Sequence, residues 1–174
     1  MRNIKNLLTL ATLASAVGAH AVLVPIAPFG TPKTEHFNLA AGAYAGFPGF
    51  AGFGGFSRVP AANALVVTGA PLLPPLSAPH AMFGRGTNVM IRFQTYQTKF
   101  GGHFRVPNAG IAVTQAKFIF RNAGGGIVGI AVAPVNNLAW QWRGWGSTIP
   151  FISVEIQGNG PLPGYVGMDY LRVN

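Results

Sequence analysis

Glycine and proline interrupt this chain too often for a helical domain. Its 174 residues include 24 glycines and 14 prolines. Beyond the first 21 residues, no stretch of ten residues keeps apolar side chains at the i, i+3, i+4, i+7 spacing of a helix without meeting one of them. Proline removes a backbone donor, and glycine costs conformational entropy in a regular element. The chain must therefore build its core from extended segments separated by turns.

Apolar and polar residues alternate along the later part of the chain. The period of two is clear in TNVMIRFQT (residues 87–95), QAKFIFRN (115–122) and PFISVEIQG (150–158). Such alternation is typical of strands buried on one face. Shorter candidate strands lie at residues 34–39, 63–68, 102–106, 126–133, 138–143 and 165–173. These segments predict an all-β fold, a two-sheet jelly-roll-type sandwich of about nine short strands.

The first 21 residues have the layout of a secretory signal peptide. Arg2 and Lys5 precede an apolar stretch over residues 7–17, and the small-x-small tripeptide AHA ends at residue 21. The apolar stretch is too short to span a bilayer of about 30 Å as a helix. A buried N-terminal helix is the alternative. We expect residues 1–21 to be removed, and residues 22–174 to be one domain of a secreted bacterial protein without a transmembrane anchor.

Cationic residues outnumber acidic ones. Twelve Lys and Arg stand against three Asp and Glu, which gives a formal net charge of +9. This excess favours anionic partners such as acidic polysaccharide, the phosphates of lipopolysaccharide, anionic lipid or nucleic acid. The cations are scattered singly without a nucleic-acid-binding motif, so no specific nucleic acid is expected. A solvated surface with few acids is the alternative.

The stretch AGAYAGFPGFAGFGGFS, residues 41–57, carries an aromatic ring at every third position. The rings belong to Tyr44, Phe47, Phe50, Phe53 and Phe56. A period of three fits a polyproline-II-like run better than an α-helix. We expect a Gly/Phe-rich loop outside the sandwich core, whose first four rings are candidates for binding a glycan, a partner or a second copy. A flexible loop folded over the sandwich edge is the alternative.

A second group of aromatic residues lies in LAWQWR, residues 138–143. Alternation places Trp140 and Trp142 on one strand face together with Leu138. Exposed tryptophan faces stack on sugar rings, so both tryptophans are candidate ligand-binding residues. Leu138 on the same face, and Trp145 just beyond, favour a position in the core instead.

Acidic residues are too few for most catalytic arrangements. A glycosidase needs two carboxyl groups about 5–10 Å apart, and the chain holds only Glu35, Glu155 and Asp169. Glu155 alternates away from an apolar strand face and is expected at the surface. The sequence also lacks cysteine, a Gly-x-Ser-x-Gly elbow, a His-Glu-x-x-His motif and a phosphate-binding glycine loop. We therefore expect no enzyme.

A structural calcium ion is the one cofactor that the residues support. Asp169 in the last candidate strand, with Glu35 or Asn38 in the first, could supply oxygen ligands between the two strands. The histidines form no close pair, which argues against zinc. In the alternative interpretation, Asp169 accepts hydrogen bonds from backbone amides at a bulge.

The landmarks of the chain also occur in a recognisable order. They are HFNLAAGAY, GFSRVPAANALVVTG, MIRFQT, KFGGHF, AKFIFRNAGGGIVG, WRGWGSTIPFISVEIQG and YVGMDYLRV. This order resembles the extracellular β-sandwich domain of PEP-CTERM-type bacterial secreted proteins over most of residues 22–174. The sequence departs from that pattern in lacking the C-terminal anchor and sorting signal, and in having Asn38 at an early acidic position. The resemblance implies an exported sandwich in a group of domains that mostly lack a demonstrated activity.

Together these features predict a non-catalytic secreted protein of the cell surface or extracellular matrix that binds polysaccharide. The alternative is a structural or self-associating extracellular protein with no small ligand, because few residues are charged and the Gly/Phe stretch is adhesive in composition.

Overall fold

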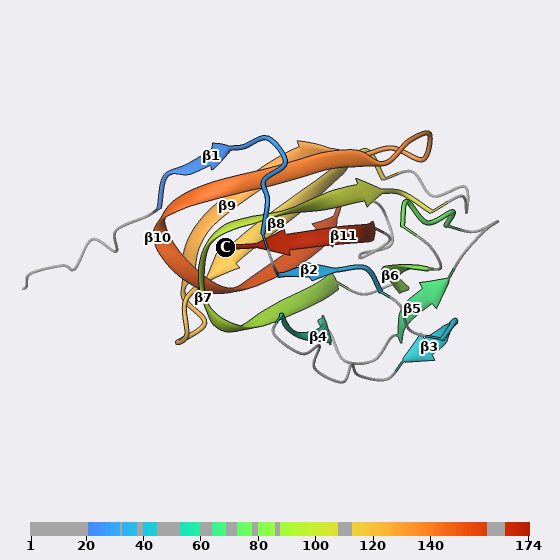
Figure 1. The fold of residues 1–174 in the computed structure, drawn as a ribbon, viewed down its shortest axis with the longest axis horizontal. Helices are drawn as coiled ribbons and strands as arrows, with labels where there is room; N and C mark the ends of the chain where they lie inside the picture. The colour runs from blue at the N-terminus through green and yellow to red at the C-terminus, as the bar shows by residue number, and fades with distance from the viewer. Residues whose placement is uncertain are drawn as a thin grey trace, which may run out of the picture.

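The computed structural model describes residues 21–31, 33–37, 40–44, 53–59, 64–68, 73–77, 80–85, 88–107, 113–159 and 166–174. These residues form strands and no helix (Figure 1), which confirms the predicted all-β fold. No helix capable of crossing a membrane occurs within these ranges. The candidate residues Asn38, Phe47 and Phe50, and residues 1–20 of the predicted signal peptide, lie outside them.

Nine short strands and two long ones make up the described fold. In chain order they are β1 (Leu23–Pro25), β2 (Thr34–Glu35), β3 (Gly42–Tyr44), β4 (Gly54–Val59), β5 (Ala64–Thr68), β6 (Ala81–Arg85), β7 (Asn88–Arg105), β8 (Gln115–Arg121), β9 (Ile127–Pro134), β10 (Gln141–Gly158) and β11 (Gly167–Val173). The long strands, β7 and β10, have 18 residues each. All pairings between these strands are antiparallel.

The two long strands belong to both layers of a sandwich. The first half of β7 pairs with β4 and its second half with β11. The first half of β10 pairs with β1 and its second half with β8. The layer β9-β8-β10-β7-β4 therefore faces the layer β1-β10-β7-β11-β6-β5-β3. Both long strands are seen as curved ribbons in Figure 1.

A break in regular pairing accompanies the change of layer. The register between β10 and β7 shifts between Gly146 and Phe151 and again before Ser153. Pro150 lies in this interval. Proline has no N–H to donate to a strand ladder, and it is tolerated here because the regular ladder between β10 and β7 is interrupted.

Phenylalanine rings fill the space between the layers. Phe104 of β7 meets Phe118 of β8 with ring centroids 4.9 Å apart, and Phe120 meets Phe151 at the same distance. Both contacts are edge-to-face, an arrangement that adds attraction beyond burial alone. All four rings are fully buried.

The ends of the Gly/Phe stretch belong to the sandwich, contrary to the predicted loop at residues 41–57. Residues 42–44 form β3, and residues 54–59 form β4. Phe53 and Phe56 are each only 3% exposed and lie in the main core. Gly54 explains the difference, because a Cβ there would lie 2.0 Å from the Arg92 carbonyl oxygen. This glycine permits close strand pairing rather than preventing it.

The buried Phe56 ring gives a test of the corrected assignment. Replacing Phe56 with alanine should lower the free energy of unfolding by about 3–5 kcal/mol, because it removes a ring that packs at 5.3 Å from Phe37. The exposed neighbour Ser57 provides the control, since Ser57→Ala should change stability little. Urea denaturation measures both. Equal denaturation midpoints for the two variants would show that residues 53–57 lie outside the core.

Candidate functional site

A bulge in β11 places polar side chains on the outer face of the β11 layer. Asp169 pairs with His103 and Arg172 with Gly101, so three steps along β11 match two along β7. The extra residue, Tyr170, has φ of 52°. Met168 and Leu171 remain in the core. The bulge therefore turns Asp169, Tyr170 and Arg172 away from the core.

Two glycines next to this bulge provide a seat for an indole ring. Trp142 pairs with His103, and Gly144 with Gly101, so all four positions share the outer face. A Cβ added to Gly101 would lie 2.5 Å from Trp142 Cζ2, and one added to Gly144 would lie 2.8 Å from it. The ring therefore lies against bare backbone. The Trp142 Nε1–H donates to the Ile26 carbonyl at 2.8 Å, which fixes the orientation of the ring.

Six partly buried side chains gather on this face and form what we call the aromatic–cation cluster. They are Phe29, His36, His103, Trp142, Tyr170 and Arg172. The Arg172 guanidinium lies 4.6 Å from the Tyr170 ring centroid and 5.9 Å from that of Trp142. A cation beside two ring faces is attracted by both.

The neighbouring rings complete the cluster. His36 meets Tyr170 at 4.5 Å, and His103 meets Trp142 at 5.4 Å between ring centroids. Burial lowers the pKa of His103, an effect that the nearby Asp169 opposes and Arg172 reinforces. The buried Nδ1 of His103 has no hydrogen-bond partner among the described residues.

Asp169 is held by donors from Leu76, Ser77 and the bulge itself. Its Oδ2 accepts from the backbone N–H groups of Leu76 and Ser77, at 2.9 and 2.8 Å, and its Oδ1 accepts from the Ser77 hydroxyl and the Tyr170 N–H, both at 2.7 Å. Burial raises the pKa of Asp169, although these donors oppose the rise. The interpretation of Asp169 as an acceptor of backbone amides at a bulge is thus confirmed.

The structure brings Glu35 close to Asp169. Glu35 pairs with Leu171 across β2 and β11, and its Oε1 accepts from the Phe37 N–H at 2.6 Å. Burial raises the pKa of Glu35, hydrogen bonds from Phe37 and His36 lower it, and the charge of Asp169 adds to the rise. Within the described ranges no three His, Asp or Glu side chains lie together as metal ligands. Calcium binding by Asp169, Glu35 and Asn38 stays a prediction.

The third carboxylate lies in the opposite layer and was expected at the surface, which is wrong. Glu155 is 4% exposed. Its Oε2 accepts from Arg121 Nη2 at 2.7 Å, and its Oε1 accepts from Asn88 and Gln157. Burial raises the pKa of Glu155, but these three donors outweigh that effect and lower it overall. Polar neighbours on the outer side of the sheet therefore bury a carboxylate that alternation alone would leave in water.

The other aromatic candidates have different surroundings. Trp140 is half-buried against Leu73 and Phe83, and its Nε1–H donates to the Pro74 carbonyl at 2.8 Å. Tyr44 is half-buried and donates its hydroxyl hydrogen to the Ala40 carbonyl. Phe53 cannot serve as an exposed ligand-binding ring because it is in the core.

Leu138 does not share a strand face with the tryptophans as predicted. It precedes β10 and is 82% exposed, so it gives no sign of a core position for Trp142. Trp145 is 5% exposed and packs on Phe118 at 4.3 Å, as its expected core role requires.

Tyr170, His103 and Arg172 were not identified from the sequence. Alternation in residues 165–173 places Asp169 and Arg172 on opposite faces, and the bulge that brings them to one face leaves no simple mark in the sequence. The only available sign of a site was the presence of a histidine, a tyrosine and an arginine within segments predicted to be strands.

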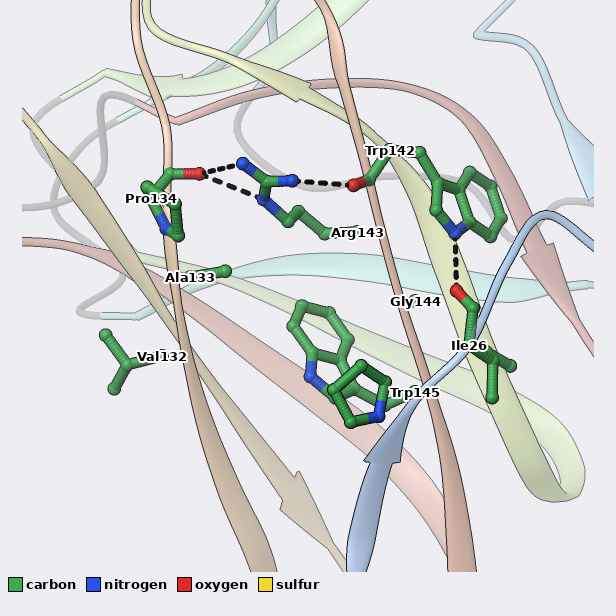
Figure 2. Close-up of a pocket in the computed structure, with 9 residues that line it drawn as sticks. Ile26, Val132, Ala133, Pro134, Trp142, Arg143, Gly144 and Trp145 are labelled. Atoms are coloured by element: carbon green, nitrogen blue, oxygen red, sulfur yellow. Dashed lines mark hydrogen bonds between the residues drawn. The ribbon is translucent and has the colours of Figure 1, made fainter.

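An open groove of about 230 Å³ lies between β1 and β9, beside Trp142 (Figure 2). Pro25 and Ile26 form one side, residues 132–134 the other, and Trp145 contributes from β10. Arg143 spans it, because Nε and Nη2 donate to the Pro134 carbonyl and Nη1 donates to that of Trp142. Burial lowers the pKa of Arg143. We interpret Arg143 as a residue that stabilises the contact between β10 and β9 through its hydrogen bonds to Pro134.

The architecture places the chain among antiparallel β-sandwich proteins. No family model and no curated protein matches it. Among solved structures it is similar to the CBM22-1 xylan-binding domain of Paenibacillus barcinonensis Xyn10C, with a TM-score of 0.50 and 12% identity over 80% of this chain and 92% of that chain. At this identity the similarity shows the sandwich fold.

The glycine seat predicts a specific defect. Gly101→Ala should displace the Trp142 ring, because the new methyl group would overlap it. We expect a changed near-ultraviolet circular dichroism spectrum and a lower melting temperature. Gly146→Ala is the matched control. Gly146 lies in β10 on the same face of the sheet, and a Cβ there would meet only Ile26 at an ordinary 3.6 Å. Similar spectra for both variants would show that no such seat exists.

The hydrogen bonds of Asp169 predict how it contributes to stability. Asp169→Asn should lower the free energy of unfolding by about 2 kcal/mol, because the amide nitrogen cannot accept the hydrogen bonds that one carboxylate oxygen accepts. We expect the same loss with and without chelator in thermal melts. A chelator-sensitive melting temperature that becomes insensitive in Asp169→Asn would instead establish the calcium site.

Proposed function

We propose that this protein is a non-catalytic polysaccharide-binding protein and that the aromatic–cation cluster is its ligand-binding face. One observation carries the proposal. The rings of Trp142 and Tyr170 stay partly exposed on the outer face of a sheet, with the Arg172 guanidinium beside both. Partly exposed rings with a fixed polar neighbour are suited to packing on a pyranose and bonding its hydroxyl groups.

Two further observations support this choice. The similar solved structure is described as a xylan-binding domain, so the same fold has carried polysaccharide binding. In addition, all three acidic side chains accept hydrogen bonds from protein groups. Carboxylates engaged in this way are poorly placed to act as a general acid or nucleophile, which favours a binding role over hydrolysis.

The proposed setting is outside the bacterial cell. It rests on the leader-like residues 1–21 and on the resemblance to PEP-CTERM-type secreted sandwich domains. A polysaccharide of the cell surface or extracellular matrix would then be the natural ligand.

A structural, self-associating role is the second candidate. Apolar side chains are exposed along the neighbouring strands β1 and β9: Val22 and Val24 are 61% and 51% exposed, and Ile130 and Val132 are 46% and 57% exposed. An apolar patch of this kind favours contact with another surface.

Binding of the protein to a panel of soluble polysaccharides in affinity electrophoresis tests the proposal. Tyr170→Asn should weaken binding by about fivefold, because it removes one stacking ring while asparagine still tolerates the positive φ. Tyr96→Asn is the control, since Tyr96 is 57% exposed and outside the cluster. Absence of binding to every polysaccharide, with concentration-dependent assembly in sedimentation, would favour the structural role. Binding that both variants retain would place the ligand elsewhere.

A further inference from the structure

We infer that the cluster binds an acidic polysaccharide, whose sugar carboxylate is received by Arg172 while the sugar ring packs on Tyr170 and Trp142. This inference rests on the proposed function and names the class of its ligand.

Cationic groups are concentrated along this part of the surface. The Lys99 ammonium lies 5.9 Å from the Phe29 ring centroid, and Phe29 in turn lies 6.0 Å from Trp142. Lys33 joins them at the end of β11, where its carbonyl accepts from Val173 N–H and its Nζ donates to Thr95. Arg172 and Lys99 therefore carry positive charges beside the rings, and Lys33 adds a third at the end of β11.

None of these cations forms an ion pair with a described residue. Across the described ranges, the single ion pair joins Arg121 to Glu155 in the opposite layer. Asp169 and Glu35 lie beneath the cluster, but they are 0% and 8% exposed and their oxygens accept from the donors already named. They offset part of the positive charge, but neither carboxylate accepts a hydrogen bond from Arg172.

Arg172 has one terminal nitrogen available in a fixed orientation. Its Nη1 donates to the Phe29 carbonyl and its Nε is buried without a partner, whereas Nη2 has no acceptor among the described residues. The Tyr170 and Trp142 rings limit the planes that the guanidinium can adopt. A carboxylate is the acceptor that suits this free donor best, because a hydrogen bond between a guanidinium and an oxygen of opposite charge is stronger than one to a neutral hydroxyl.

A uronic acid combines the two chemistries that the cluster provides. Its pyranose ring has C–H groups to place on an aromatic ring, and its C5 carboxylate lies at the edge of that ring. A neutral sugar would leave the unpartnered guanidinium donors without a charged acceptor, which costs affinity when water is excluded. A nucleic acid or a lipid headgroup would supply phosphate, and phosphate binding alone would not need rings placed beside the cation.

Matched polymers separate charge recognition from sugar recognition. Isothermal titration in about 0.15 M NaCl should show that polygalacturonate, alginate or both bind at least about tenfold more tightly than their neutral esters. Esterification removes the carboxylate charge and keeps the backbone of each polymer.

Charge-neutral variants then locate the effect. Arg172→Gln should weaken binding to the acid form far more than binding to the ester, so that the preference for the acid form disappears. Lys117→Gln removes the same charge from the exposed face of β8 in the other layer and should keep the preference. If Arg172→Gln does not fold, the exposed Lys99→Gln gives the same test, with an expected loss of about threefold for the acid form alone.

Each alternative outcome has its own meaning. Equal affinity for acid and ester forms, with Tyr170→Asn weakening both, would overturn the acidic ligand and leave polysaccharide binding intact. So would binding to neutral polysaccharides alone. An equal loss of acid binding in Arg172→Gln and Lys117→Gln, or equally tight binding to a DNA oligonucleotide, would show attraction of any polyanion and overturn the inference. Failure to bind any polysaccharide would overturn the proposed function itself.

Discussion

The pairing of β7 with β10 along both layers is the constraint on which the structure depends. Each strand has 18 residues and changes layer near the interval where the register shifts. Before and after that interval, the same two backbones present inward rings such as Phe104 and Phe151 to one core. The second half of β7 also fixes which positions face outward, so the location of His103 and Gly101 follows from the way the core closes.

The cluster is formed by backbone features more than by any one side chain. A missing Cβ at Gly101 and Gly144 lets an indole lie on the sheet, and one extra residue in β11 places Asp169 and Arg172 on the same face. Leu76 and Ser77 donate to the Asp169 carboxylate, which is fully buried beside the cluster. The cations at the rim consequently face water without an acidic partner of their own among the described residues.

Sequence patterns were informative where alternation was unbroken. The segment around Phe118 and the amide-bound Asp169 were both anticipated correctly, because side-chain period and a bulge acceptor are local properties. The long strands were not, because Gly101, Gly102 and Pro150 look like interruptions in a one-dimensional pattern. In three dimensions they are places where a ring, a side chain or a bend needs room. Residues such as Phe53 were misplaced for the same reason: glycine-rich sequence was taken as loop, although close strand contact also requires glycine.

The partner of β1 has a consequence for the order in which the molecule can assemble. Val22 donates its N–H to the Thr148 hydroxyl, 126 positions later, and β1 pairs with residues 145–147 of β10. During synthesis, the first strand to emerge therefore has no partner until nearly the whole chain has followed it. Contacts between residues so distant in sequence form slowly, because a large loop must first close, and closing it costs conformational entropy. The N-terminal edge of the sandwich is thus the last to be completed. The β1 segment stays unpaired with β10 while most of the chain is synthesised.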